Sequence, residues 1–144
     1  MKWAALIAWV LTAGGGFVLL SVWLREGGIA RGREGGDRIR PPLIFSHFGL
    51  AATGLVLWII YVATDTDALA WIAFVALVVV AALGWTMFAI WWRRRQRGVV
   101  DTAAGMTESL PAEQRFPVPI VALHGVLAVA TVLLVLLSAL DVGS

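Results

Sequence analysis

Long apolar runs, separated by short polar segments, form the main pattern of this chain. Four runs contain no charged residue: about 3–24, 43–64, 68–92 and 116–140. Each is long enough to cross a bilayer as a helix, which takes about 20 mostly apolar residues. A helix of a water-soluble bundle keeps a polar face, and these runs have none. The pattern therefore predicts an all-α integral membrane four-helix bundle, with residues 1–144 as a single four-span domain.

Charged residues gather between the runs, and their signs differ from one connection to the next. The segments 25–42 and 93–115 hold ten of the eleven basic residues, whereas the short connection between the second and third runs carries Asp65 and Asp67. Arginine-rich loops stay in the cytoplasm, so we expect an N-out/C-out protein made of two tandem hairpins. Lys2 is the one basic residue on the opposite side. The pI of about 9.9 reflects this topology and contact with anionic lipid headgroups, not nucleic acid.

Composition narrows the class further. The chain is 60% hydrophobic and contains no cysteine, which excludes disulfides, iron–sulfur clusters, thiolate zinc and thioether-linked haem. Arginine outnumbers lysine ten to one, which is typical of a GC-rich bacterial genome, so we expect a multi-pass protein of the bacterial cytoplasmic (inner) membrane. The first run is long enough to span, so we expect a retained helix and not a removed signal peptide. Tryptophans near the span ends are interpreted as an interfacial belt: Trp3, Trp23, Trp71, Trp91 and Trp92.

The only two histidines occupy matching positions in the chain. Each lies five residues after a proline: His47 after Pro42, and His124 after Pro119. The second and fourth runs align without gaps at a spacing of 77 residues, and Trp23-Leu-Arg25 resembles Trp92-Arg-Arg94 as a span ending. The chain therefore resembles two hairpins of the same topology, which would be related by an axis along the membrane normal.

The two histidines are the best candidates for chemistry. Imidazole is the commonest protein ligand for a metal, and both residues lie about 8–10 Å inside the span on parallel helices. If these helices are diagonal, their axes are roughly 11–14 Å apart, which suits one porphyrin between two imidazoles and is too wide for direct contact. Zinc would be two ligands short. We therefore predict non-covalent haem b, with His47 and His124 as metal ligands.

Small and charged residues near the histidines fit this interpretation. A shallow strip for a flat macrocycle is expected at Ala51 and Gly54 on one helix and at Ala128 and Thr131 on the other. Arg40 and Arg115 could pair with haem propionates, and Ser46 or Thr131 could orient an imidazole N–H. Additional small residues are Gly14, Gly15, Gly16 and Gly84. Met87 is an alternative axial ligand, ranked below the histidines because methionine is an ordinary filler of apolar cores.

With four predicted spans and the histidines His47 and His124, the chain resembles small four-helix membrane b-type cytochromes of cytochrome b561-like architecture. That resemblance implies electron transfer, with a quinone or a larger respiratory or redox complex as partner. Members of that group carry two histidine pairs, and one pair cannot relay electrons across about 30 Å of hydrocarbon. No catalytic residue is identified, so an electron-transfer or accessory protein is favoured over a stand-alone enzyme. Two alternatives stay open: a structural or assembly subunit whose histidines only pack, and haem delivery or sensing. A homo-oligomer is also open.

Overall fold

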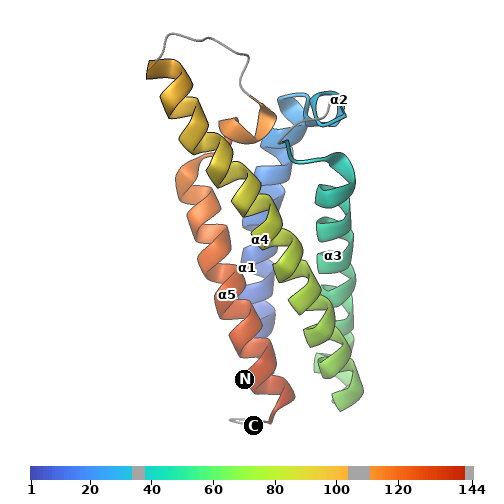
Figure 1. The fold of residues 1–144 in the computed structure, drawn as a ribbon. Coiled ribbons are helices and arrows are strands. Elements are labelled where there is room, and N and C mark those ends of the chain that lie inside the picture. The colour runs from blue at the N-terminus through green and yellow to red at the C-terminus, as the bar shows by residue number, and fades with distance from the viewer. Residues whose placement is uncertain (34–37, 104–110, 142–144) are drawn as a thin grey trace.

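The computed structural model describes residues 1–33, 38–103 and 111–141, with side chains up to Arg97 in the second range. Four long helices cross the molecule: α1 (Lys2–Arg25), α3 (Pro41–Thr64), α4 (Asp67–Ala103) and α5 (Val118–Ala139) (Figure 1). All four are long and apolar enough to span a membrane. This confirms the predicted all-α four-helix membrane bundle. Two short helices, α2 (Gly28–Arg31) and η1 (Ala112–Arg115), lie in the connections 25–42 and 93–115, which are only partly described.

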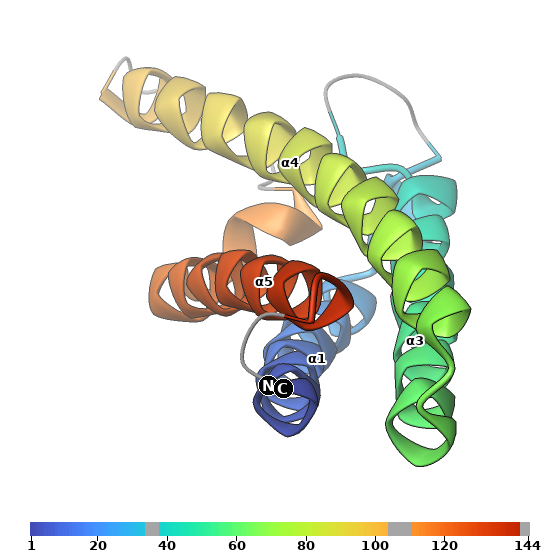
Figure 2. The ribbon, with the colours of Figure 1, turned by 90° about the horizontal axis from the view of Figure 1, so that it is seen from below.

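The spans follow the order α1, α3, α4, α5 around the bundle, so α3 faces α5 across the centre (Figure 2). Packing is most extensive between α3 and α4, which are consecutive, and between α1 and α5, which are the first and last spans. The start of α1 and the end of α5 lie at one end of the bundle, and α2 and η1 lie at the other (Figure 1). We call these the terminal end and the arginine-rich end; the latter comprises the described residues 25–33, 38–40, 93–103 and 111–115.

Local sequence sets the helix limits. Prolines stand in the first turn of both α3 and α5, where a missing N–H leaves no internal hydrogen bond unmade. Helix α3 ends where Asp65 adopts a left-handed conformation, with φ of 51°, and donates its N–H to the carbonyl of Tyr61. Helix α4 begins two residues later with Asp67, an acidic first-turn residue that suits the helix dipole. Helix α4 continues to Ala103, beyond the end at residue 92 that hydropathy predicted for its span.

The outer faces of the helices are apolar, as expected for surfaces in contact with lipid. Val126, Ile7 and Val75 are each more than half exposed and come from three different helices. Polar side chains are instead turned inward at three buried positions, Glu113, Thr131 and Ser138. This distribution is the reverse of that in a water-soluble bundle, and it supports a multi-pass protein in a lipid bilayer.

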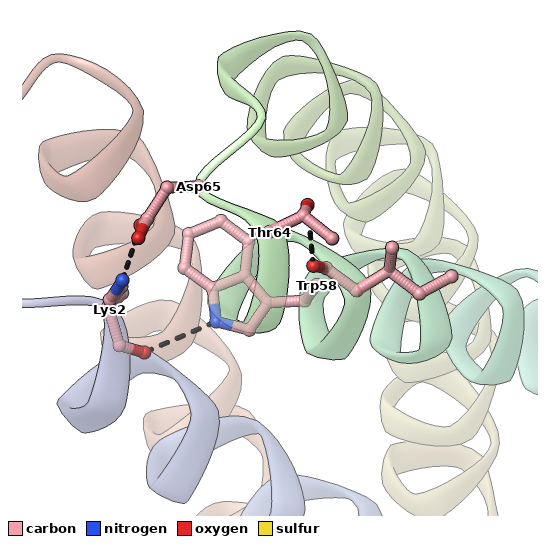
Figure 3. A network of polar contacts seen from close by, with 5 residues as sticks. Lys2, Trp58, Thr64 and Asp65 are labelled. Atoms are coloured by element: carbon pink, nitrogen blue, oxygen red, sulfur yellow. Dashed lines mark hydrogen bonds and ion pairs between the residues drawn. The ribbon is translucent and has the colours of Figure 1, made fainter.

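An aromatic core fills the terminal end. Trp9 and Trp58 are buried with ring centroids 6.4 Å apart, and Tyr61 packs 4.8 Å from Trp58. The Trp58 indole Nε1 donates to the backbone carbonyl of Lys2 at 3.3 Å (Figure 3). The Lys2 ammonium is also paired with the carboxylate of Asp65. The single basic residue on this side of the protein is thus neutralised by an acidic residue of the α3–α4 connection.

A second core closes the arginine-rich end. Its centre is formed by Trp23 and Trp91, which are 0% and 3% exposed. The prediction that these two tryptophans belong to an interfacial belt is therefore wrong, because they face the bundle interior and not the lipid. Gly28 of α2 lies so close to Trp23 that a Cβ at Gly28 would come within 2.2 Å of the indole. Helix α2 is thereby packed against Trp23 near the end of α1.

Candidate functional site

The two histidines lie opposite each other in the centre of the bundle. His47 comes from α3 and His124 from α5, and their ring centroids are 6.4 Å apart with an angle of 62° between the planes. Both side chains are partly buried. The rings approach more closely than the diagonal helix spacing suggested, because each side chain reaches inward from its own helix. The expectation that the gap is too wide for His–His contact was therefore wrong.

Each imidazole is held by a backbone carbonyl of a neighbouring helix. His47 Nδ1 lies 3.0 Å from the carbonyl oxygen of Val80 on α4, and His124 Nδ1 lies 2.9 Å from that of Thr12 on α1. A carbonyl oxygen can only accept, so Nδ1 carries the proton in both rings. The prediction that Ser46 or Thr131 orients an imidazole N–H is contradicted, since backbone oxygens take that role.

Glycine explains why these two carbonyls can accept an extra hydrogen bond. In a helix, the side chain of residue i+4 lies over the turn that holds carbonyl i. The residues four positions after Thr12 and Val80 are Gly16 and Gly84. A Cβ at Gly16 would lie 3.2 Å from Cε1 of His124, and a Cβ at Gly84 would lie 3.2 Å from Cε1 of His47. The missing side chain thus exposes the carbonyl and makes room for the ring at the same place.

The two halves of the chain use the same arrangement. Thr12 and Gly16 on α1 correspond to Val80 and Gly84 on α4, a separation of 68 residues. The same separation relates Trp23 to Trp91, both of which are buried at the arginine-rich end. The sequence-based pairing of Trp23 with Trp92 was therefore wrong by one residue. The two halves therefore make the same histidine–carbonyl and histidine–glycine contacts, and each histidine packs against the first helix of the other half.

On the terminal side of the histidines, side chains fill the interior of the bundle. A Cβ at Gly54 would lie 3.0 Å from Cζ2 of Trp9, so the indole already occupies the space beside this glycine. Thr131 is buried, and its hydroxyl lies 3.0 Å from that of Thr12. Ala51 and Ala128, one turn nearer the histidines, are only partly buried. We call the level of the bundle that holds His47 and His124 the histidine layer. Of the four strip residues predicted from the sequence, Ala51 and Ala128 lie next to this layer, and Gly54 and Thr131 lie about one turn further toward the terminal end.

The second core lies on the other side of the histidines, toward the arginine-rich end. All four spans contribute partly buried side chains to it: Leu20, Leu43, Met87, Ile90, Phe116 and Val121. Met87, the alternative axial ligand, belongs to this packing. Trp91 stands behind it, and its buried Nε1 has no hydrogen-bond partner among the described residues. No sequence signal marks this atom, because the belt interpretation accounted for every tryptophan at a span end.

The two arginines named as propionate partners lie outside the core. Arg40 is exposed at the start of α3, where it lines an open pocket of about 340 Å³ together with Arg33, Gly32 and two prolines. Arg115 is also exposed, with its Nε 3.9 Å from a carboxylate oxygen of Glu26. Both guanidinium groups are thus at the arginine-rich end, and neither is in contact with an imidazole in the structure.

The chemistry available at the site depends on the histidine pair. Among the described residues, no group of three His, Cys, Asp or Glu side chains is placed to hold a metal ion. The chain matches no protein-family model, no curated protein and no solved structure. The assignment of a function therefore depends on the geometry of His47 and His124 and on the residues that surround them.

Proposed function

We propose that this protein binds one b-type haem between His47 and His124 and serves in membrane electron transfer. The observation that carries the proposal is the facing pair of imidazoles from α3 and α5, with 6.4 Å between ring centroids. A first-row metal ion lies about 2.0–2.1 Å from an imidazole nitrogen, and the ring centre is roughly 1 Å further, so rings that share one metal have centroids about 6 Å apart. The observed spacing agrees with this value.

The protonation state of the rings supports the same conclusion. With Nδ1–H donated to a carbonyl, Nε2 of each ring is the unprotonated nitrogen that can bind a metal. A metal-binding histidine almost always donates its other N–H to a carboxylate, carbonyl or water, which fixes the tautomer and the ring orientation. Two ligands are too few for a bare ion, but they are sufficient for a metal whose remaining positions are filled by a macrocycle.

Bound haem would supply one-electron exchange, and ligation by both histidines would leave no open position for oxygen. The histidine layer lies toward the arginine-rich end, which the positive-inside rule assigns to the cytoplasm. We therefore place the electron-transfer site in the cytoplasmic half of the bacterial inner membrane. A single site in one half requires a partner, and a quinone or a larger redox complex has the matching chemistry.

The test is the absorption and EPR spectrum of the full chain, purified in detergent from cells supplied with a haem precursor. We expect a Soret band and a low-spin ferric signal from two axial imidazoles. His47→Ala and His124→Ala should each abolish the low-spin signal, and added imidazole should restore it by filling the space left by the side chain. Ser46→Ala is the matched control, because Ser46 is exposed beside His47.

A structural subunit is the competing function, and one observation favours it. The Nδ1 bonds tie α3 to α4 and α5 to α1, so the histidines link helices without any cofactor. In that case the wild-type protein has no Soret band, and both alanine variants lose stability only. If one variant alone loses the low-spin signal, Met87 or a second copy of the chain becomes the other ligand, and the bis-histidine proposal fails.

A further inference from the structure

A buried hydrogen-bond donor without a partner lies at the arginine-rich end of the bundle. Trp91 is 3% exposed, and its Nε1 is enclosed without a partner among the described residues. Leaving such a donor unpaired costs about 1–3 kcal/mol, and the penalty is larger in a membrane interior, where water cannot replace the partner. In native proteins an orphaned buried donor often marks the position of a group that binds there.

The surroundings of Trp91 favour a negatively charged partner. The Arg95 guanidinium lies over the same indole, 5.6 Å from the ring centroid. Gln114, from another segment, donates its amide Nε2 to the backbone carbonyl of Trp91 at 3.3 Å, and the indole N–H has no acceptor among the described residues. A donor next to a cation fits a carboxylate, because a hydrogen bond to a charged acceptor is about twice as strong as one between neutral groups.

The position of Trp91 matches the direction in which a ligand at the histidines can extend. Toward the terminal end, the site is closed by Trp9 against Gly54 and by the Thr12–Thr131 pair. Toward the arginine-rich end, the second core includes the partly buried side chains of Leu20 and Met87, which a haem that reaches Trp91 would displace. Trp91 lies seven residues beyond Gly84 on α4, which is about 10 Å along the helix axis. That separation is comparable to the distance from the iron of haem to its carboxylate oxygens.

We infer that the Trp91 indole N–H binds a propionate carboxylate of the haem, with Arg95 reinforcing the negative charge. This inference rests on the proposed haem site and adds an orientation to it. The propionates face the arginine-rich end, and one of them is held by Trp91 in addition to any contact with the exposed Arg40 and Arg115.

The test compares the affinity of two proteins for two iron porphyrins. Purified apoprotein, wild type or Trp91→Phe, is titrated with haem b and with iron etioporphyrin, which has no carboxyl group. We expect Trp91→Phe to weaken haem b binding about 10-fold or more and to leave iron etioporphyrin binding unchanged. Trp23→Phe is the matched control, since Trp23 is the equivalent buried residue of the first half.

Three other outcomes contradict the inference. An equal loss for both porphyrins shows that Trp91 only packs, and no loss for either shows that its N–H has another partner. If wild-type protein leaves the Soret band of both porphyrins unshifted from that of the free porphyrin, the haem site itself is wrong and the inference falls with it. Should Trp91→Phe fail to fold, 3-benzothienylalanine at position 91 removes only the N–H and keeps the ring shape, and the same difference between porphyrins is required.

Discussion

Gly84 lies directly against the imidazole of His47, and a Cβ at this position would come within 3.2 Å of the ring carbon Cε1. Gly16 stands in the same relation to His124. These glycines allow each ring to reach the carbonyl of the preceding turn, on Val80 or Thr12. The helices that carry no histidine thus control how the histidines are oriented.

Substitution of these glycines should weaken haem binding without removing a ligand. In Gly84→Ala and Gly16→Ala, the methyl group must move the ring by a few tenths of an ångström away from its carbonyl. Loss of such a supporting contact typically lowers metal affinity by about 10-fold or more. Titration with haem b measures the change. Gly49→Ala and Gly125→Ala are matched controls, because a Cβ there meets nothing within 4 Å; an equal loss in the controls would show a general helix effect.

Thr12 makes contacts through its side chain and through its backbone, and the two kinds can be separated by mutation. The hydroxyl bonds to that of Thr131, whereas the carbonyl accepts from His124. Thr12→Val removes the hydroxyl, with its contacts to Thr131 and to the backbone carbonyl of Ala8, and keeps the carbonyl that accepts from His124. We therefore expect a loss of about 1 kcal/mol in the free energy of unfolding, as for an interhelical hydrogen bond in a membrane, with the haem spectrum unchanged. A double-mutant cycle with Thr131→Val, measured by unfolding in SDS, should show coupling; additive losses would contradict the bond.

Gly28 allows helix α2 to pack against Trp23 near the end of α1. A methyl group at Gly28 would come within 2.2 Å of the Trp23 ring, so Gly28→Ala forces the loop or the indole to move. Overpacking of this kind typically destabilises by about 1–3 kcal/mol. Stronger quenching of tryptophan fluorescence by acrylamide would report the exposure of Trp23. Ile29→Ala, at an exposed neighbouring position, should leave the quenching unchanged.

The pair between Lys2 and Asp65 should contribute little to stability. The two side chains are 28% and 72% exposed, and ion pairs in contact with water typically contribute about 0.2–1 kcal/mol. Lys2→Met and Asp65→Asn should therefore show weak coupling in unfolding experiments, and the coupling should decrease as salt is added. A large coupling that persists at high salt would place this pair in a much drier environment than its exposure indicates.

The sequence was sufficient to predict the architecture and the central pair of residues. In lipid, the backbone N–H and C=O groups of four uncharged runs can all be hydrogen-bonded only if the runs are helical. The prolines that precede His47 and His124 are at the helix starts, so both histidines lie at one depth. The diagonal position of α3 and α5 was an assumption that the structure bears out and not a result of the sequence. The ring separation does not follow from the sequence either, because it depends on how far each side chain reaches inward.

Contacts between distant segments could not be predicted from the sequence. The carbonyls of Val80 and Thr12 have no side-chain signature, and the glycine four residues later is informative only once the facing helix is known. Trp23 and Trp91 resemble belt residues in the sequence because both lie at span ends. At a span end, a tryptophan on the outer face contacts lipid headgroups, whereas one on the inner face packs in the core. The repeat register was misaligned by one residue because apolar helices match one another at several offsets.

The pairing of α1 with α5 has a consequence for biosynthesis. Helix α1 leaves the ribosome before the other three of these spans, but its main packing partner is α5, which follows all of them. The carbonyl of Thr12 and the space beside Gly16 receive His124 only when the final helix has entered the membrane. The α3–α4 hairpin, with His47 already docked on Val80, is complete earlier. Insertion of the last span is thus the step that completes the histidine layer, and a chain arrested before α5 carries only half of it.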